Sequence, residues 1–277
     1  MSTESRNPRS YGLHKMSTVE IVRLMNQEEH AVLRALEEAA EPIAQAAEKA
    51  CEAFQRGGRI IYVGSGTSGR IATLDAAEMP PTFGIDSDVF IALVSGGAEA
   101  QATAKEDAED DEHSAVVMLN EMGISRKDIL IGLAASGRTP FVLSAVRHAR
   151  QKGLWTCGIA NNRDAPLLDA ADLGILLATG PEVLTGSTRL KAGTAQKLAL
   201  NRISTTAMVL SGKVIENLMV DVKAKNQKLK ERCARIVRDL TTATFDEAYE
   251  LLDNNEWSVR RVLAVLADSA PSTTERT

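Results

Sequence analysis

The chain has 277 residues, of which 44% are apolar and 25% charged, and its net charge is −5. This length and composition allow one large core or two smaller ones, which excludes a disordered or fibrous protein. Lysine and arginine are spread along the chain, so the basic field that nucleic acid or an anionic membrane requires is missing, and we expect neither as a partner.

The first residues, MSTESRNPRSYGLHKMS, lack the apolar core of a signal peptide, and no later window approaches the length of a membrane-spanning helix. We therefore expect a cytosolic protein. The three cysteines, Cys51, Cys157 and Cys233, are far apart and the four histidines show no ligand spacing. These features predict buried thiols and no metal site.

Residues 1–56 are predicted to form an N-terminal helical segment. Ser17-Thr18-Val19-Glu20 is a capping-box pattern followed by apolar residues at helical spacing, which predicts that a helix begins there. Pro42 restarts the pattern, and a second amphipathic helix from Ile43 to Phe54 ends at Gly57-Gly58.

From Arg59 onward, short apolar runs alternate with helical segments. The runs are IIYVG (60–64), VFIALVS (89–95), ILIGLAA (129–135), TCGIAN (156–161) and LGILLA (173–178). Continuous apolar strands of this kind are buried on both faces, which predicts an α/β domain with a parallel sheet. We place this domain at residues 57–222.

After Gly180-Pro181 the pattern is helical almost to the end of the chain. A long core helix is predicted from about residue 190 to residue 210, and three shorter helices between about residues 223 and 267. A second capping box, Thr244 to Glu247, starts one of these. Residues 223–277 are therefore predicted to form a small C-terminal helical subdomain.

Two segments repeat one design. IIYVGSGTSGR (60–70) and ILIGLAASGRTP (129–140) are each an apolar strand, a small-residue turn, Ser-Gly-Arg and a helix. A turn from a parallel strand into a helix points free backbone N–H groups beyond the carboxyl edge of the sheet, which suits an anion. The candidate phosphate ligands are Ser65, Gly66, Thr67, Ser68, Ser136 and Thr139. Tight turns and N-caps without a ligand are the alternative.

The stretch GSGTSGR also matches the dinucleotide fingerprint and the first half of a P-loop. Arg70-Ile71 replaces the Lys-Ser/Thr pair of a P-loop, which argues against nucleoside triphosphate binding. NAD binding requires an acidic residue at the carboxyl end of the second strand, but that strand ends in Ser95-Gly96-Gly97. NAD is therefore the weaker alternative.

Glu78 lies in LDAAEMPPTFG (74–84), where Met79 precedes Pro80. Pre-proline residues disfavour α geometry, so we expect the helix to end there, with Glu78 in its last turn. The helix macrodipole would then raise the pKa of Glu78, as a general acid/base requires. An exposed glutamate without a catalytic role is the alternative, and for Asp75 a structural role is expected.

Further charged candidates lie in two later segments. In KEDAEDDEHS (105–114), Glu106 and Glu109 share a helix face, although such an acidic run is more often a solvated surface. In GPEVLTGSTRLKAGTAQK (180–197), Arg189 and Lys191 could supply charge to an anionic ligand. A loop followed by a surface helix start is the alternative there.

Together, GRIIYVGSGTSGR, LDAAEMPPTFG, AEDD, GLAASGRTPFV, GPEVLTGSTRLKAGTAQKLALN and NLMVDV resemble the N-acetylmuramic acid 6-phosphate etherases of the sugar-isomerase (SIS) domain superfamily. The resemblance extends from about Asn7 through the helical tail. It implies an SIS domain, a three-layer α/β/α parallel-sheet fold, between the N-terminal helices and the C-terminal helical subdomain.

The resemblance implies a cofactor-independent lyase of peptidoglycan recycling that cleaves the D-lactyl ether of N-acetylmuramic acid 6-phosphate by elimination and hydration. Glu78 matches the acid that protonates departing lactate, and Glu109 matches the second catalytic carboxylate. Ser65, Thr67, Ser68, Ser136 and Thr139 match phosphate-loop positions, with Glu106 and Lys191 as further substrate contacts. The family resemblance also implies a homodimer.

Two other functions are compatible with the same loops. A phosphosugar isomerase would use them with one carboxylate and release no lactate, and a non-catalytic sugar-phosphate sensor would only bind. The chain also departs from the family pattern at Ser65, Asp107 and NNRDAP (161–166), where the family usually has Ala, Gly and a Cys-Asn-Pro turn. These departures concern the shape of the sugar pocket and leave the proposed carboxylates in place.

Overall fold

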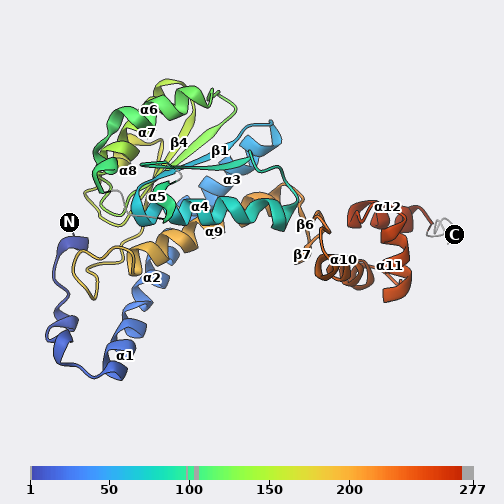
Figure 1. Cartoon of the computed structure of the whole chain (residues 1–277), viewed down its shortest axis with the longest axis horizontal. Coiled ribbons are helices and arrows are strands. Elements are labelled where there is room, and N and C mark those ends of the chain that lie inside the picture. Colours follow the sequence, from blue (N-terminus) through green and yellow to red (C-terminus); the bar gives the residue numbers. More distant parts are fainter. Residues whose placement is uncertain (1, 98, 103–105, 270–277) are drawn as a thin grey trace, which may run out of the picture. The chain divides into compact units, whose positions relative to one another are not determined.

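The computed structural model describes residues 2–97, 99–102 and 106–269 of the chain (Figure 1). It divides into two compact units. The first unit comprises residues 1–77 and 87–207, and the second comprises residues 78–86 and 208–277.

The first unit is built on a five-stranded parallel sheet with the order β2-β1-β3-β4-β5. The strands are β1 (Ile60–Gly64), β2 (Phe90–Val94), β3 (Ile129–Leu133), β4 (Trp155–Ala160) and β5 (Leu173–Leu176). They fall within or overlap the five predicted apolar runs, so the prediction of a parallel α/β domain is confirmed. Gly64 is in register with Val94 and with Leu133, which aligns the carboxyl ends of three neighbouring strands.

Helices cover both faces of this sheet (Figure 1). On one face lie α6 (Glu112–Glu121), α7 (Pro140–Gln151) and α8 (Pro166–Ala170). Their buried side chains form a core with Ile61, Val63 and Leu130 of the sheet. On the other face lie α3 (Ala40–Gln55), α4 (Gly66–Phe83) and α9 (Lys191–Leu210), the long core helix predicted from the sequence.

The N-terminal segment is helical, as predicted. It contains three short 3-10 helices, η1 (Ser2–Glu4), η2 (Pro8–Ser10) and η3 (Leu13–Lys15), followed by α1 (Thr18–Glu28) and α2 (His30–Glu38). The predicted capping box is present, because the Ser17 backbone N–H donates to the Glu20 carboxylate over 2.7 Å. The helix expected to restart at Pro42 begins at Ala40, with Pro42 in its first turn, where its missing N–H is harmless.

Helix α4 continues through Pro80 and Pro81 to Phe83, so the prediction that it ends at Met79 is wrong. The two prolines deprive the Ala76 and Ala77 carbonyls of their helical donors. Met79 and Phe83, one turn apart, are buried at 3% and 4% exposure, and this packing outweighs the local preference. Glu78 therefore lies inside the helix rather than in its last turn, where the macrodipole would act on it.

The second unit contains the three predicted C-terminal helices, α10 (Gln227–Leu240), α11 (Phe245–Asp253) and α12 (Val259–Ser269). The predicted capping box at Thr244 is present at the start of α11. The helices enclose an apolar core in which Tyr249 and Trp257 meet edge to face at 4.8 Å. A pair of two-residue antiparallel strands, β6 (Val214–Ile215) and β7 (Leu218–Met219), was not predicted.

The remaining short elements are α5 (Glu99–Ala102) and η4 (Glu106–Asp110). All three cysteines are buried thiols, as predicted. None of the helices in the described ranges has the length and apolar character needed to cross a bilayer.

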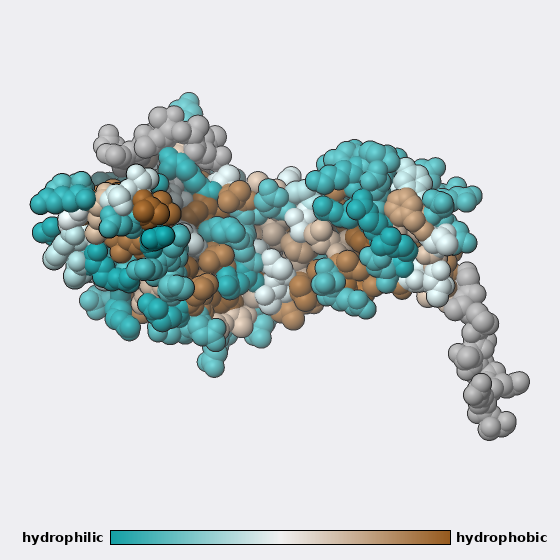
Figure 2. Space-filling model, turned by 90° about the horizontal axis from the view of Figure 1, so that it is seen from below, coloured by the Kyte–Doolittle hydropathy of each residue, from teal (hydrophilic) through white to brown (hydrophobic). Residues whose placement is uncertain are grey.

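The face shown in Figure 2 is mostly hydrophilic with scattered apolar patches, a normal surface for a globular chain.

Candidate functional site

The candidate site lies at the carboxyl edge of the sheet between β1 and β3. We call residues 65–69, which follow β1, the first loop, and residues 134–139, which follow β3, the second loop. Since Gly64 pairs with Leu133, the two loops leave the sheet side by side. They lead to α4 and α7 on opposite faces, which makes this edge the topological switch point where doubly wound folds bind ligands.

Two glycines let the first turn of α4 lie close against the sheet. A Cβ added to Gly64 would lie 2.7 Å from the Gly69 backbone nitrogen, and one added to Gly69 would lie 2.6 Å from Cγ1 of Val94. Between them, Gly66 adopts a φ of +51°, which favours glycine. This close packing leaves the N–H groups of the first helical turn facing the carboxyl edge of the sheet, where an anion can bind.

The Ser68 hydroxyl proton is committed to the protein. The Leu177 carbonyl can only accept, so it fixes the Asn161 amide with Nδ2 donating to it over 2.9 Å. Asn161 Oδ1 then accepts from Gln196 Nε2 at 3.0 Å, and Gln196 Oε1 accepts from Ser68 Oγ at 2.7 Å. Ser68 therefore anchors the first loop to α9, and its hydroxyl has no proton left for a ligand in this arrangement.

The other four predicted hydroxyls keep their protons. Ser65 Oγ accepts from the buried Ser95 hydroxyl at 2.6 Å, and Ser136 Oγ accepts from the Arg138 backbone N–H at 3.1 Å. Thr67 and Thr139 have no side-chain hydrogen bond to any described residue. The two loops thus present four neutral hydroxyl donors, all on half-buried residues, which can hydrogen-bond to an anion. The supporting role of Ser95 was not predicted, since it becomes visible only when β2 pairs with β1.

The second loop is held by the neighbouring strand end. The Asn162 Nδ2 donates to the Ala135 carbonyl at 2.9 Å. Gly137 has a φ of +66°, and an added Cβ there would clash with the methyl group of Ala165. The loop shape thus depends on glycine at this position and on the segment after β4.

The N-terminus of α9 is already occupied by a protein carboxylate. The Lys191 and Ala192 backbone N–H groups donate to Glu182 at 3.1 and 2.9 Å. Glu182 is fully buried, and burial raises its pKa although these hydrogen bonds oppose the rise. The start of α9 is therefore not available to an anionic ligand in this arrangement.

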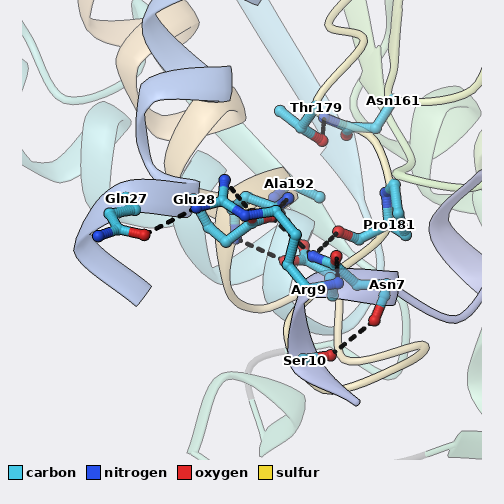
Figure 3. Close-up of polar contacts among 11 residues, drawn as sticks. Asn7, Arg9, Ser10, Gln27, Glu28, Asn161, Thr179, Pro181 and Ala192 are labelled. Carbon is cyan, nitrogen blue, oxygen red and sulfur yellow. Dashed lines mark hydrogen bonds and ion pairs between the residues drawn. The ribbon is translucent and has the colours of Figure 1, made fainter. Parts of the chain in front are cut away.

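Lys191, a predicted substrate contact, is 3% exposed and ion-paired with Glu28 at 2.6 Å. Figure 3 shows Glu28 surrounded by Asn7 and Arg9, which bind it at 2.7 and 2.9 Å. Lys191 can bind a ligand only if its ammonium group leaves Glu28 and pairs with the ligand instead. Arg189, the other cation of this segment, makes no hydrogen bond or ion pair with any described residue.

The predicted catalytic carboxylates lie on separate elements. Glu78 is exposed on α4, in the part of that helix assigned to the second unit, and Glu109 is exposed on η4 in the first unit. Glu106 begins η4, and its side chain lies outside the described part of the structure.

Asp75 is a structural residue, as expected from the sequence. Its carboxylate, 4% exposed, accepts hydrogen bonds from Tyr62 at 2.9 Å, Asn201 at 2.7 Å and Ser204 at 3.1 Å. Burial raises its pKa, and these three hydrogen bonds oppose the rise. Asp75 thus ties α4 to β1 and α9, one turn before Glu78.

The chain is similar over most of its length to curated proteins named N-acetylmuramic acid 6-phosphate etherase. The protein of that name from Geobacillus sp. (strain WCH70) is 50% identical over 241 residues, covering 87% of this chain and 82% of the relative. The one from Actinobacillus pleuropneumoniae serotype 7 (strain AP76) is 42% identical over 279 residues, covering 100% of this chain and 91% of the relative.

Family models and solved structures agree with the fold. Residues 42–150 match the glucokinase regulatory protein N-terminal SIS domain, and residues 110–203 match the SIS domain. A phosphoheptose isomerase from Francisella tularensis superposes with a TM-score of 0.55 at 18% identity, covering 70% of this chain and 100% of that chain. A phosphoheptose isomerase from Neisseria gonorrhoeae superposes with a TM-score of 0.50 at 20% identity, covering 68% of this chain and 97% of that chain. At these identities the likeness establishes the SIS fold alone.

Proposed function

This chain belongs to the N-acetylmuramic acid 6-phosphate etherase family, and we propose that it converts N-acetylmuramic acid 6-phosphate to N-acetylglucosamine 6-phosphate and D-lactate in peptidoglycan recycling. The observation that carries the proposal is the pair of hydroxyl-bearing loops at the topological switch point. Relatives that share the etherase name over nearly the whole chain give this anion site its substrate class.

The substrate phosphate binds between the two loops. Ser65, Thr67, Ser136 and Thr139 donate hydroxyl hydrogen bonds to it, and Gly66 with the first turn of α4 adds backbone N–H groups. Ser68 supports this arrangement through Gln196 rather than through its own proton. Neutral donors suit a phosphate that must be released after each turnover, because they bind it less tightly than a cluster of cations would.

The reaction is an elimination followed by a hydration. In the open-chain aldehyde the C2 proton is acidic, and Glu109 removes it. The electron pair forms the C2–C3 double bond while the C3–O bond breaks, and Glu78 protonates the departing lactate oxygen. Glu78 then takes a proton from water as its oxygen adds to C3, and Glu109 returns a proton to C2. Each transfer contributes about 10²–10⁴-fold to the rate.

Glu78 and Glu109 are both exposed in the single chain, whereas a carboxylate that exchanges protons near neutral pH needs partial burial. We therefore propose that the chain acts as a homodimer in which the second copy helps to enclose these carboxylates. Glu106, three residues before Glu109, and Lys191 are proposed further substrate contacts, Lys191 after release from Glu28.

The function is tested by incubating the purified protein with N-acetylmuramic acid 6-phosphate and measuring D-lactate. In ¹⁸O-labelled water, addition at C3 predicts label in N-acetylglucosamine 6-phosphate and none in lactate. Label in lactate would contradict the mechanism. Sugar-phosphate binding without lactate release would instead indicate a sensor, and interconversion of aldose and ketose phosphates would indicate an isomerase.

A further inference from the structure

A cavity of about 370 Å³ adjoins the second loop within the first unit. Its walls come from the segments that follow β3, β4 and β5 and from Ser2 of η1, and they include Arg138, Asn161, Asn162, Arg163 and Asp164. None of these residues takes part in the reaction proposed above. The lining is rich in groups that donate hydrogen bonds, so the ligand the cavity would accept is an acceptor.

The amides in this wall are already satisfied, whereas the guanidinium groups are not. Asn161 and Asn162 are buried, and their Nδ2 groups donate to the carbonyls of Leu177 and Ala135. Arg138 uses Nη2 to donate to the Asp164 carbonyl at 3.0 Å, which leaves most of its donors free. The amides therefore set the shape of the wall, and the guanidinium groups supply its unused donors.

Arg163 is the stronger candidate for binding a ligand. Its side chain is exposed, and within the described ranges no residue is hydrogen-bonded or ion-paired with its guanidinium. Asp164 also lines the cavity, so two arginines and one aspartate leave a net charge of +1 there. This balance favours a single carboxylate.

The proposed substrate carries two anionic groups, the phosphate at C6 and the carboxylate of the lactyl ether at C3. The neutral hydroxyls of the two loops account for the phosphate only. Arg138 belongs both to the second loop and to the cavity, so one ligand can contact the loop hydroxyls and the cavity together.

We propose that Arg163, assisted by Arg138, binds the lactyl carboxylate, so that this cavity distinguishes the ether substrate from phosphosugars that lack the acid. A planar guanidinium binds a carboxylate through two parallel N–H···O hydrogen bonds, a geometry that lysine cannot reproduce. The inference rests on the proposed etherase function. It concerns selectivity between ligands, which can be measured separately from lactate release.

The test compares Arg163→Ala and Arg163→Lys with the wild type and with Arg147→Ala. Arg147 is an exposed arginine on α7 without a hydrogen bond or ion pair to any described residue, so its loss removes the same charge elsewhere on the same unit. The measurements are KM for N-acetylmuramic acid 6-phosphate and the inhibition constant of N-acetylglucosamine 6-phosphate, which lacks the carboxylate. Thermal melting of each variant reports folding.

We expect Arg163→Ala to raise KM about tenfold, the usual effect of one charged hydrogen bond, and to change the inhibition constant less than about twofold. The KM of Arg163→Lys should lie between those of Arg163→Ala and the wild type, and the KM of Arg147→Ala should equal that of the wild type. An unchanged KM, or equal changes for both ligands, would overturn the inference. Absence of lactate release by the wild type would overturn the proposed function instead. The ratio of the dissociation constants of the two ligands, compared between the wild type and Arg163→Ala, would still decide the role of Arg163.

Discussion

Lys191 Nζ and Glu28 Oε2 are 2.6 Å apart, and the two side chains are 3% and 7% exposed. The pair joins the end of α1 to the first residue of α9, segments far apart in the sequence. Asn7 binds the same carboxylate oxygen at 2.7 Å and also donates to the Pro181 carbonyl at 3.3 Å (Figure 3). One carboxylate therefore fixes the N-terminal segment to the helix that carries Gln196.

Replacing Glu28 with Gln should destabilise the protein by about 3–5 kcal/mol, because the Lys191 ammonium would remain buried without its counter-charge. The measurement is the free energy of unfolding in urea. Glu231→Gln is the matched control, since it breaks an exposed Arg235 pair on α10 that contributes about 0.3–0.5 kcal/mol. Equal losses in the two variants would contradict the assignment of a buried, structural ion pair.

The same carboxylate predicts a loss of stability in acid. Burial by itself raises the pKa of Glu28, but Lys191, Asn7 and Arg9 outweigh burial and hold that pKa below its ordinary value of 4.5. The unfolded chain then binds the proton more readily, so this contribution is complete above about pH 4.5 and is lost as the pH falls through the lower folded pKa. Urea midpoints of the wild type should decrease over that range more steeply than those of Glu28→Gln. Parallel curves would show that Glu28 does not contribute.

Replacing Gly137 with Ala should disturb the second loop more than the strain of a left-handed backbone conformation alone would. Gly123 is the control, because its φ of +60° is close to the +66° of Gly137 but an added Cβ there meets nothing within 4 Å. Gly123→Ala should cost about 1 kcal/mol of stability. Gly137→Ala should cost more and weaken N-acetylglucosamine 6-phosphate binding, measured by calorimetry. Equal affinities in the two variants would remove the second loop from the phosphate site.

Thr67 and Ser68 are neighbours with different predicted roles. Thr67→Val removes a free hydroxyl at nearly constant shape, and we expect the Kd for N-acetylglucosamine 6-phosphate to rise about tenfold. Ser68→Ala leaves Gln196 Oε1 buried without its donor, so it should lower stability by about 1–3 kcal/mol while the Kd changes less than about threefold. The reverse result would place the Ser68 hydroxyl on the ligand.

Glu78→Gln and Glu109→Gln should each lower kcat at least about 100-fold, because each removes a proton-transfer group, while product binding is retained. Glu121→Gln, an exposed glutamate on α6, serves as the control and should leave kcat unchanged. The assay is D-lactate release, with calorimetry for N-acetylglucosamine 6-phosphate. Near-normal turnover in either variant would exclude that carboxylate from the mechanism.

Local signals predicted the elements that depend on local physics. Five apolar runs became β1–β5, and the capping boxes at Ser17 and Thr244 start α1 and α11. The end of α4 was predicted wrongly, because the burial of Met79 and Phe83 is a tertiary effect that outweighs the preference set by Pro80. The strand pair β6–β7 is only two residues long on each side, too short for a periodic pattern.

The sequence by itself determined that the chain forms a parallel α/β domain with two Ser-Gly-Arg turns, because alternation of apolar runs and small-residue loops is encoded within each segment. Only the tertiary structure decided that these turns meet, because strand order depends on how helices cover the sheet faces. It also decided which hydroxyls are free, since the Leu177 carbonyl, distant in the sequence, directs the Ser68 proton through Asn161 and Gln196. The direction of each hydrogen bond depends on all the donors and acceptors in its network, and here these come from segments far apart in the sequence.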